Sequence, residues 1–192
     1  YRMPDYYRWL LYDADHRPAY RYHRMFLQHL QSGVGGQWLL KSPAHLWQLD
    51  ALLAEYPDAL IVQTHRDPLN VIASISALIH HLRRMASDES SIPDCAAQSR
   101  EQIVVGLEYA MKMRDSGVLP ADQVVDVHFR DFMKDPFATI CGLYGRLGRE
   151  LSPTAEQRMR EHLAAHPGDH GGNRKIDRFA ASAHARGPGL EA

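Results

Sequence analysis

The sequence predicts an α/β protein in which a parallel sheet is flanked by helices on both faces, making three layers. Short apolar runs alternate along the chain with longer segments whose apolar residues recur at helical spacing. At two junctions a helix-capping residue and a proline come directly after such a run. Strands that alternate with helices usually pair in parallel, and parallel strands covered on both faces are continuous apolar runs.

The first half of the chain is expected to contain two strands. Residues 18–31 have the spacing of an amphipathic helix, and the glycine-rich residues 32–36 end it. The apolar run at residues 38–40 is expected to be a short buried strand. A serine and a proline then start a second helix over residues 42–56. The second strand is predicted over residues 59–65.

The second half repeats this arrangement and adds a third strand. An aspartate followed by a proline starts its first helix, and a polar loop separates that helix from a longer one. The expected elements are, in order, a helix over 67–85, a loop over 87–94, a helix over 95–115, a strand over 124–129, and helices over 136–147 and 153–165.

The domain organisation follows from this count of strands. Three strands form a thin sheet for an α/β domain, so we expect more strands upstream of Tyr1. Residues 1–165 are therefore interpreted as part of a domain that is incomplete at its N-terminus. Residues 166–192 are rich in Gly, Ala, His and Arg without apolar periodicity, which predicts a loosely ordered C-terminal tail.

Composition excludes several classes of function. The 192 residues carry a net charge of −1, so no global field attracts nucleic acid or anionic lipid. No apolar stretch is long enough for a membrane span. Cys95 and Cys141 are interpreted as free thiols, which favours a cytoplasmic protein. The twelve histidines form no ligand pattern, so we expect no metal site.

One candidate ligand site lies between the strand over 59–65 and the helix that follows it. Arg66 leaves the strand end just before a helix N-terminus, where a guanidinium and backbone N–H groups can bind one phosphate together. Asp67 is expected to cap this helix. Ser74 lies off the apolar face and is predicted to point to solvent or to a ligand. From spacing alone, a capped helix with an exposed arginine and serine is slightly favoured. The predicted apolar face comprises Leu69, Ile72, Ile75, Ser76, Ile79 and Leu82.

A second candidate site follows the run at residues 38–40. Lys41 stands at the strand end, Ser42 at the helix N-cap and His45 at the third helical position. A helix N-terminus disfavours positive charge on His45, which keeps the imidazole neutral and able to accept a proton. Lys41 can neutralise negative charge that develops on a leaving phosphate. The alternative is a histidine that only packs against its neighbours.

Three strings carry a family resemblance: WLLKSPAHL at residues 38–46, YPDA at 56–59, and THRDP at 64–68 followed by Ser74. Together they resemble the sulfotransferase family, most closely its bacterial branch. In that family an arginine at a strand end and a serine eight positions later bind the 3′-phosphate of the donor, 3′-phosphoadenosine 5′-phosphosulfate (PAPS). Arg66 and Ser74 match both residue types and the spacing. The resemblance covers roughly residues 1–165.

Two later strings and one missing loop complete the comparison with the sulfotransferase family. FRDFMKDP at 129–136 is similar to the family's strand-end segment, whose leading aromatic lies near the adenine. Phe129 holds that place, and a plain core position is an equal alternative. GGNRK at 171–175 resembles the family's late basic segment only loosely. Arg174 is thus a candidate 3′-phosphate ligand, with a charged tail residue as the favoured alternative. The family's Gly/Ser/Thr-rich 5′-phosphosulfate loop is absent from this chain.

The resemblance implies the P-loop-kinase-like sulfotransferase fold and transfer of a sulfuryl group from PAPS to an acceptor hydroxyl or amine. Adenosine 3′,5′-bisphosphate is the implied product, and no metal is needed. His45 is the expected base and Lys41 the expected stabiliser of the leaving phosphate. Small-molecule, lipid and carbohydrate acceptors remain open. Two alternatives stand beside this function: a kinase-like phosphotransferase, whose G-x-x-x-x-G-K-[ST] motif the chain lacks, and an inactive truncated binding protein of the same fold.

Overall fold

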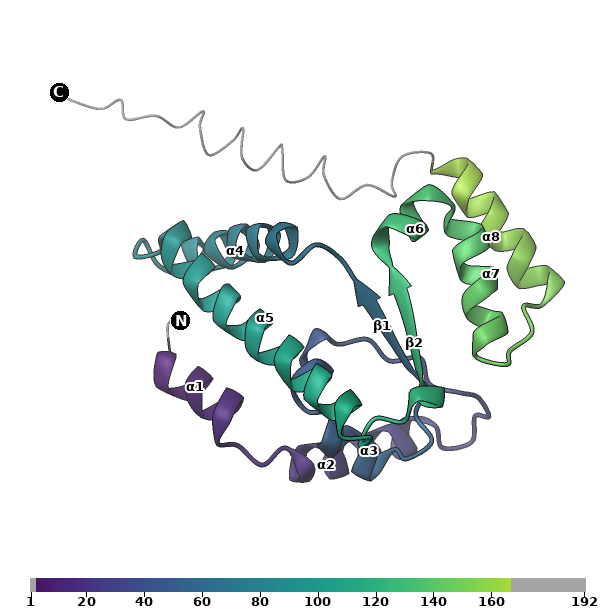
Figure 1. Cartoon of the computed structure of the whole chain (residues 1–192), viewed down its shortest axis with the longest axis horizontal. Helices are drawn as coiled ribbons and strands as arrows, with labels where there is room; N and C mark the ends of the chain where they lie inside the picture. The colour runs from purple at the N-terminus through teal and green to yellow at the C-terminus, as the bar shows by residue number, and fades with distance from the viewer. Residues whose placement is uncertain (1–2, 167–192) are drawn as a thin grey trace.

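A parallel pair of strands lies at the centre of this computed structural model, which describes residues 3–166. Strand β1 (Ile61–His65) pairs with β2 (Val124–His128), in a register that runs from Ile61 opposite Val124 to His65 opposite His128. Figure 1 shows helix α5 on one side of the pair and helices α7 and α8 on the other. The α/β class with helices on both faces of a parallel sheet is therefore confirmed.

The strand predicted over residues 38–40 does not form. The described part of the chain contains two strands, β1 and β2, and not three. Residues 38–40 belong to no helix or strand, and Leu39 is 95% exposed. An apolar run becomes a strand only when a neighbour pairs with its backbone groups. The described residues offer this run no such neighbour.

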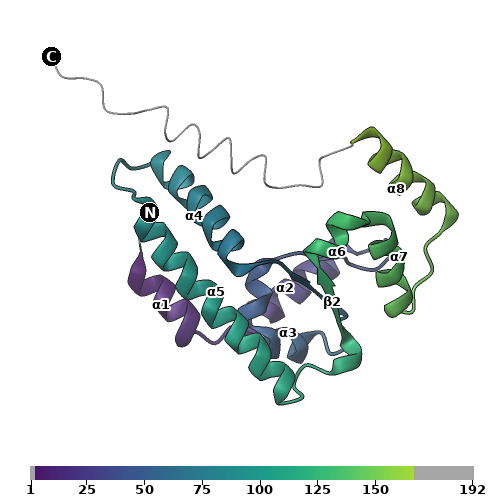
Figure 2. The same cartoon turned by 45° about the horizontal axis from the view of Figure 1, so that its top comes forward.

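Four helical elements precede β1. They are α1 (Pro4–Tyr12), α2 (Arg17–Leu30), the 3₁₀ helix η1 (Pro43–Trp47) and α3 (Leu49–Glu55). The single helix predicted over 42–56 is thus two, because Gln48 leaves the helical conformation between them with φ −147°. Helix α1 was not predicted. Figures 1 and 2 show it beside α5, where the Tyr12 hydroxyl donates a 3.0 Å hydrogen bond to Glu101.

Four of the helices after β1 agree closely with the sequence, whereas the 3₁₀ helix Ala121–Gln123 and the helix Phe129–Lys134 were not predicted. Phe129 begins the latter helix instead of ending the preceding strand. In order, the helices after β1 are α4 (Pro68–Arg84), α5 (Ile92–Asp115), η2 (Ala121–Gln123), α6 (Phe129–Lys134), α7 (Pro136–Arg146) and α8 (Pro153–Ala165). Helix α5 begins three residues earlier than predicted, because the Ser91 hydroxyl accepts a hydrogen bond from the Asp94 backbone and caps it. The loop predicted over 87–94 is correspondingly shorter.

The hydrophobic core lies between α2, α3 and α5 and extends to the first residues of both strands. Helix α3 supplies four buried residues, and α5 lies across them. The buried members are Tyr20, Leu49, Ala51, Leu52, Leu53, Ala110, Met113 and Leu119. Burial of each larger apolar side chain contributes about 1.5–3 kcal/mol, so this cluster is a main source of stability. It fixes α2 and α3 under the start of the sheet.

Glycine at position 106 of α5 permits a close contact with η1. The Trp47 indole N–H donates a 2.7 Å hydrogen bond to the Gln102 carbonyl. A Cβ at position 106 would lie 2.7 Å from the same indole nitrogen. Only glycine therefore leaves room for this ring, and the contact anchors η1 to α5.

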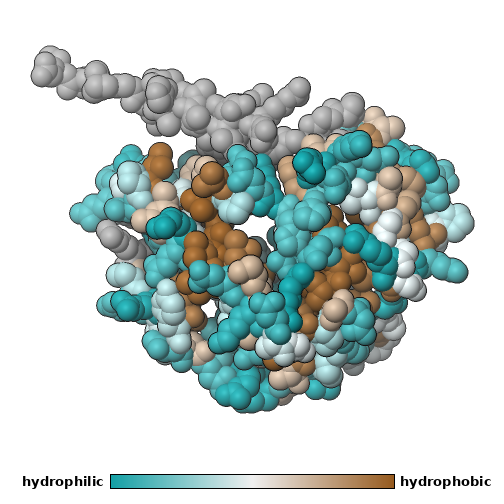
Figure 3. Space-filling view, viewed as in Figure 1, coloured by the Kyte–Doolittle hydropathy of each residue, from teal (hydrophilic) through white to brown (hydrophobic). Residues whose placement is uncertain are grey.

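A large share of apolar surface stays exposed (Figure 3). The apolar face predicted for α4 is only partly buried: Ser76 lies inside against α5, whereas Leu69 is 76% exposed and Leu82 54% exposed. The contact of α4 with α5 therefore decides which α4 side chains are buried, and part of the predicted apolar face stays exposed. Extended apolar surface of this kind normally marks a contact surface.

Three further predictions concern the cysteines, membrane spans and the C-terminal residues. Both cysteines are free thiols, with Cys95 buried and Cys141 partly buried. Among the residues that the structure describes, no helix is long and apolar enough to cross a membrane. Arg174, and all of the predicted 166–192 tail after His166, lie outside the described residues.

Candidate functional site

The carboxyl ends of the two strands bring Arg66 and Phe129 together. Because β1 and β2 are parallel and in register, the residues that follow His65 and His128 leave the same edge of the sheet. The Arg66 guanidinium carbon lies 4.6 Å from the centre of the Phe129 ring, a cation–π stack. Both residues are partly buried. Two residues that are 63 positions apart in sequence thus form one surface.

A polar network fixes the strand ends below this stack. Asp126 of β2 accepts two hydrogen bonds from Arg114 of α5, at 3.0 and 2.7 Å, and its carboxylate lies 2.6 Å from His65 Nε2. Arg114 also donates to the Gln63 side chain at 2.7 Å. The Arg114 hydrogen bonds hold the Asp126 pKa well below its usual range, with a further contribution from His65. The network joins β1, β2 and α5, and it holds the residue directly before Arg66.

Helix α4 begins as the sequence predicts. The Asp67 carboxylate accepts from the Leu69 backbone N–H at 3.0 Å and from the Asn70 side chain at 2.7 Å. This carboxylate is therefore engaged at the helix N-cap. Ser74 lies in the second turn of α4 and is partly buried.

The second candidate junction is built on η1. Ser42 caps this short helix by accepting from the Ala44 backbone N–H at 3.3 Å. His45 is the third residue of η1, as predicted, and Lys41 lies exposed two residues before the first residue of η1. The His45 Nδ1 atom is 2.7 Å from the Tyr20 hydroxyl of α2.

Burial lowers the pKa of His45, and the nearby His23 lowers it further. The expected direction is therefore correct, but burial replaces the helix N-terminus as the main cause. The Tyr20 hydroxyl stays protonated near neutrality, because burial raises its pKa to about 12. His45 is thus a neutral imidazole with one nitrogen engaged by a neutral phenol.

The predicted site residues fall into two groups. Arg66 and Phe129 meet at the strand ends, with Ser74 on the helix that follows Arg66. His45 and Lys41 belong to η1 and the segment before it, where the contacts of His45 are with α2. Arg174 lies outside the described residues. Among the described residues, no group of three or more His, Cys, Asp or Glu side chains could hold a metal ion.

Sequence reasoning missed the partners of these residues. Tyr20 precedes His45 by 25 positions, and no local feature of the sequence links the two residues. Asp126 interrupts the apolar run of β2, and this lone acid inside a strand was a signal that the sequence did offer. Its partner Arg114, in the last turn of α5, has no local feature that singles it out.

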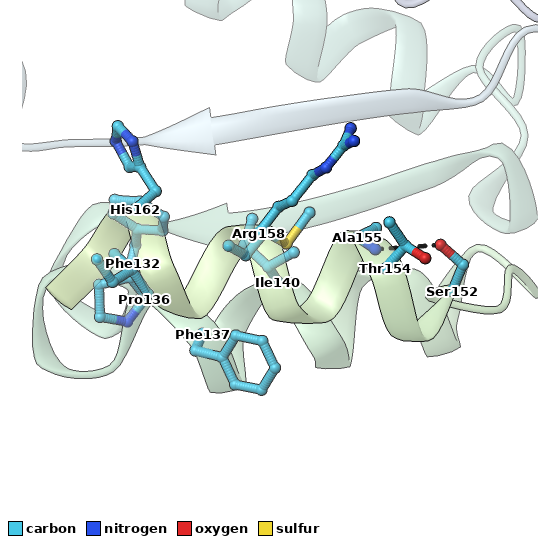
Figure 4. Close-up of a pocket in the computed structure, with 11 residues that line it drawn as sticks. Phe132, Pro136, Phe137, Ile140, Ser152, Thr154, Ala155, Arg158 and His162 are labelled. Carbon is cyan, nitrogen blue, oxygen red and sulfur yellow. Dashed lines mark hydrogen bonds between the residues drawn. The ribbon is translucent and has the colours of Figure 1, made fainter. Parts of the chain in front are cut away.

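An apolar pocket of about 570 Å³ lies elsewhere, between α6, α7 and α8 (Figure 4). Phe132, Phe137 and Ile140 contribute to its lining, while Arg158 and His162 of α8 are among its few polar residues. None of the predicted site residues lines it. The pocket is therefore separate from both candidate junctions.

Comparisons with known proteins agree with the strings in the sequence. A profile described as "Sulfotransferase family" matches residues 2–153. The crystal structure of sulfotransferase STF9 from Mycobacterium avium superposes with a TM-score of 0.80 and 24% identity, covering 99% of this chain and 52% of that one. Sulfotransferase STF1 from Mycobacterium tuberculosis H37Rv gives a TM-score of 0.71 and 32% identity, covering 93% and 48%. The chain thus spans about half the length of each solved structure. No curated protein matches it.

Proposed function

Because the chain belongs to the sulfotransferase family, we propose that it forms part of an enzyme that transfers a sulfuryl group from PAPS to an acceptor hydroxyl or amine. The donor's 3′-phosphoadenosine is bound at the strand ends by Arg66, Ser74 and Phe129. Since the chain spans about half the length of the two solved sulfotransferases, residues 1–165 form one part of the sulfotransferase domain. The acceptor is a small molecule, a lipid or a carbohydrate, and the enzyme works in the cytoplasm.

The stack of Arg66 on Phe129 is the observation that supports this function most directly. A planar guanidinium presents N–H donors whose spacing matches two oxygens of a phosphate, which suits Arg66 to the donor's 3′-phosphate. The aromatic ring beside it suits a purine, because base–aromatic stacking is worth about 1–3 kcal/mol. A cation for the 3′-phosphate and a ring for the adenine thus occur side by side. The neighbouring Asp67 carboxylate accepts hydrogen bonds at the N-cap of α4.

The donor supplies an activated sulfuryl group on a phosphosulfate anhydride. In the proposed reaction the acceptor proton moves to His45 Nε2, the acceptor oxygen or nitrogen bonds to sulfur, and the sulfur–oxygen bond to the donor phosphate breaks. His45 suits the role of base because burial keeps it neutral. Lys41 stabilises negative charge on the departing phosphate. Adenosine 3′,5′-bisphosphate leaves, and the imidazolium then releases its proton to solvent.

A thermal-shift experiment on this chain tests the donor site. Adenosine 3′,5′-bisphosphate at a hundred times its Kd should stabilise the folded chain by about 2.7 kcal/mol, because it binds only the native state. ADP, which lacks the 3′-phosphate, should raise the melting temperature much less. Stabilisation by ADP and not by the bisphosphate would favour the kinase-like alternative. No shift with either nucleotide would contradict the proposed site.

Transfer activity needs a separate assay on the complete gene product. Radiolabelled sulfate should pass from PAPS to an acceptor mixture containing phenols, sugars and lipids. If the 192-residue chain binds the bisphosphate but transfers no sulfate, the chain alone is a nucleotide-binding part of the enzyme. If the complete gene product is also inactive with every acceptor class, the binding-protein alternative is favoured.

A further inference from the structure

The contact between Tyr20 and His45 constrains the proposed base. Tyr20 lies in the hydrophobic core, where only 6% of the residue is exposed. Its hydroxyl oxygen is 2.7 Å from His45 Nδ1, and the two rings are 5.8 Å apart with 38° between their planes. His45 itself sits on a short 3₁₀ helix. The core residue Tyr20 therefore holds the side chain of His45, which lies on this short 3₁₀ helix.

The proton on the imidazole decides whether His45 can act as a base. A neutral imidazole carries its proton on one nitrogen, and only the other nitrogen can accept a second one. If Nδ1 carries the proton, the Tyr20 oxygen accepts it in a hydrogen bond and Nε2 is ready to act. If Tyr20 instead donates to Nδ1, the proton of His45 is on Nε2 and blocks that position. The same 2.7 Å contact fits either arrangement.

We propose that Tyr20 is a positioning residue whose hydroxyl oxygen accepts the Nδ1–H of His45 and so holds the imidazole in the form with a basic Nε2. This inference rests on the proposed role of His45 as the base. Once Nε2 takes the acceptor proton, the imidazolium still has an Nδ1–H, and the same hydrogen bond stabilises it. No group then needs to move during transfer, which is the advantage of a preorganised site.

The surroundings of Tyr20 support a fixed hydroxyl. Its ring lies edge-on to His23 at 6.3 Å, and His23 Nδ1 is in turn 2.7 Å from the Tyr56 hydroxyl. The titratable groups of this cluster are Tyr20 and His23 on α2, together with Tyr56 at the end of α3 and Asp50 within α3. The tyrosines are neutral near pH 7, because burial raises the pKa of both hydroxyls. A neutral phenol oxygen can accept the Nδ1–H without placing a charge in the core.

The tautomer can be measured on this chain without any catalysis. Nitrogen-15 NMR of the histidine rings, at a pH where His45 is neutral, should find its proton on Nδ1. The Tyr20→Phe variant keeps the ring and removes the hydroxyl, so the proton should redistribute toward Nε2, which imidazoles favour in water. Tyr22→Phe is the matched control, since Tyr22 lies on the same helix and is 71% exposed. It should leave the His45 signals unchanged.

Two results would overturn the proposal. One is a wild-type His45 with its proton on Nε2, which needs no variant and so holds even if Tyr20→Phe folds poorly. The other is a folded Tyr20→Phe variant, judged by its melting temperature, in which the proton stays on Nδ1. Either result makes Tyr20 a donor or a bystander.

Kinetics on the complete gene product separates this inference from the proposed function. Tyr20→Phe should lower kcat roughly tenfold, since a hydrogen bond of about 1 kcal/mol or slightly more is lost, while the KM for PAPS stays unchanged. A changed donor KM with an unchanged kcat would contradict a positioning role. If His45→Ala leaves kcat intact, the assignment of the base is wrong, and the NMR result on the tautomer stands independently.

Discussion

The guanidinium carbon of Arg66 lies 4.6 Å from the centre of the Phe129 ring, although 63 residues separate them along the chain. The pairing of β1 with β2 produces this stack, because the two residues follow strand ends that are level with each other. A cation and an aromatic ring at one edge of a parallel sheet are suited to a phosphorylated nucleoside. The predictions below test the parts of this arrangement separately.

Arg66→Ala should weaken the binding of adenosine 3′,5′-bisphosphate by roughly ten- to a hundredfold. A hydrogen bond to a charged group contributes about 1.5–3 kcal/mol, and each 1.4 kcal/mol is tenfold in affinity. Isothermal titration calorimetry on the chain measures the change. Arg160→Ala is the matched control, because Arg160 stacks on Phe137 at 3.7 Å between α8 and α7 and makes an ion pair with Glu156. An equal loss in both variants would mean that Arg66 has no specific role.

The stack itself should show energetic coupling between its two members. Arg66→Ala, Phe129→Leu and the double variant form a cycle in which leucine keeps an apolar side chain and removes the ring. The cation–π contact predicts a coupling free energy on the order of 0.5–1 kcal/mol, measured by urea unfolding without ligand. The bisphosphate should bind Phe129→Leu more weakly than wild type, since adenine loses its stacking partner. Additive effects in the cycle would argue that the two residues act independently.

His45 should stay active as a base to a lower pH than an ordinary histidine. Burial and then His23 lower the pKa of His45. The apparent pKa on the acid side of the kcat–pH profile should therefore lie below the usual histidine value of about 6.5. Replacing His23 with Gln removes the second cause and should move that limb toward higher pH. His29→Gln, on the exposed side of the same helix, is the control. If the pH profile of the complete gene product is the same with and without His23→Gln, then His23 does not influence the pKa of His45.

Asp126→Asn should destabilise the fold near neutral pH and lose its effect in acid. Arg114 and His65 depress the pKa of Asp126 in the folded chain, so its contribution is present above the unfolded value of about 3.9. That contribution disappears as the pH falls from about 3.9 toward the folded pKa. The side chain is 39% exposed, so we expect only about 1 kcal/mol after solvent screening.

Urea unfolding at pH 7 and again below pH 4 measures this pH dependence. The difference between wild type and Asp126→Asn should shrink at the lower pH. Asp88→Asn is the control, since Asp88 is 97% exposed and lies 3.7 Å from Arg84. A difference that is constant with pH would mean that the charge of Asp126 does not contribute.

Gly106→Ala should destabilise the chain although alanine favours helices. A Cβ at this position would lie 2.7 Å from the Trp47 indole nitrogen, which must move and lose its hydrogen bond to Gln102. The loss should exceed the gain of about 1 kcal/mol in helix propensity. Gly142→Ala in α7 is the control, because a Cβ there meets nothing within 4 Å and should stabilise. Thermal unfolding and the Trp47 indole N–H resonance report both changes.

Helix caps and strand ends were predictable because they depend on interactions between residues that are close in sequence. Ser42 and Asp67 cap their helices through backbone groups two residues away, and the sequence contains both partners. The strand before Arg66, the strand over 124–128 and the helices α4, α5, α7 and α8 followed from apolar runs, helical spacing and capping residues. The position of Arg66 at a strand end likewise follows from the residues next to it in sequence. These features are set by nearby residues and not by distant parts of the chain.

Tertiary structure decided which of these residues meet. Residues 38–40 read as a strand, yet they form none here, because a strand exists only with a hydrogen-bonding partner. His45 reads as a base aided by a helix end, whereas packing against α2 sets its pKa and gives it Tyr20 as a partner. The stack of Arg66 on Phe129 depends on the register of two distant strands. Sequence determined the candidate chemistry; burial and strand pairing, which act between distant residues, determined its geometry.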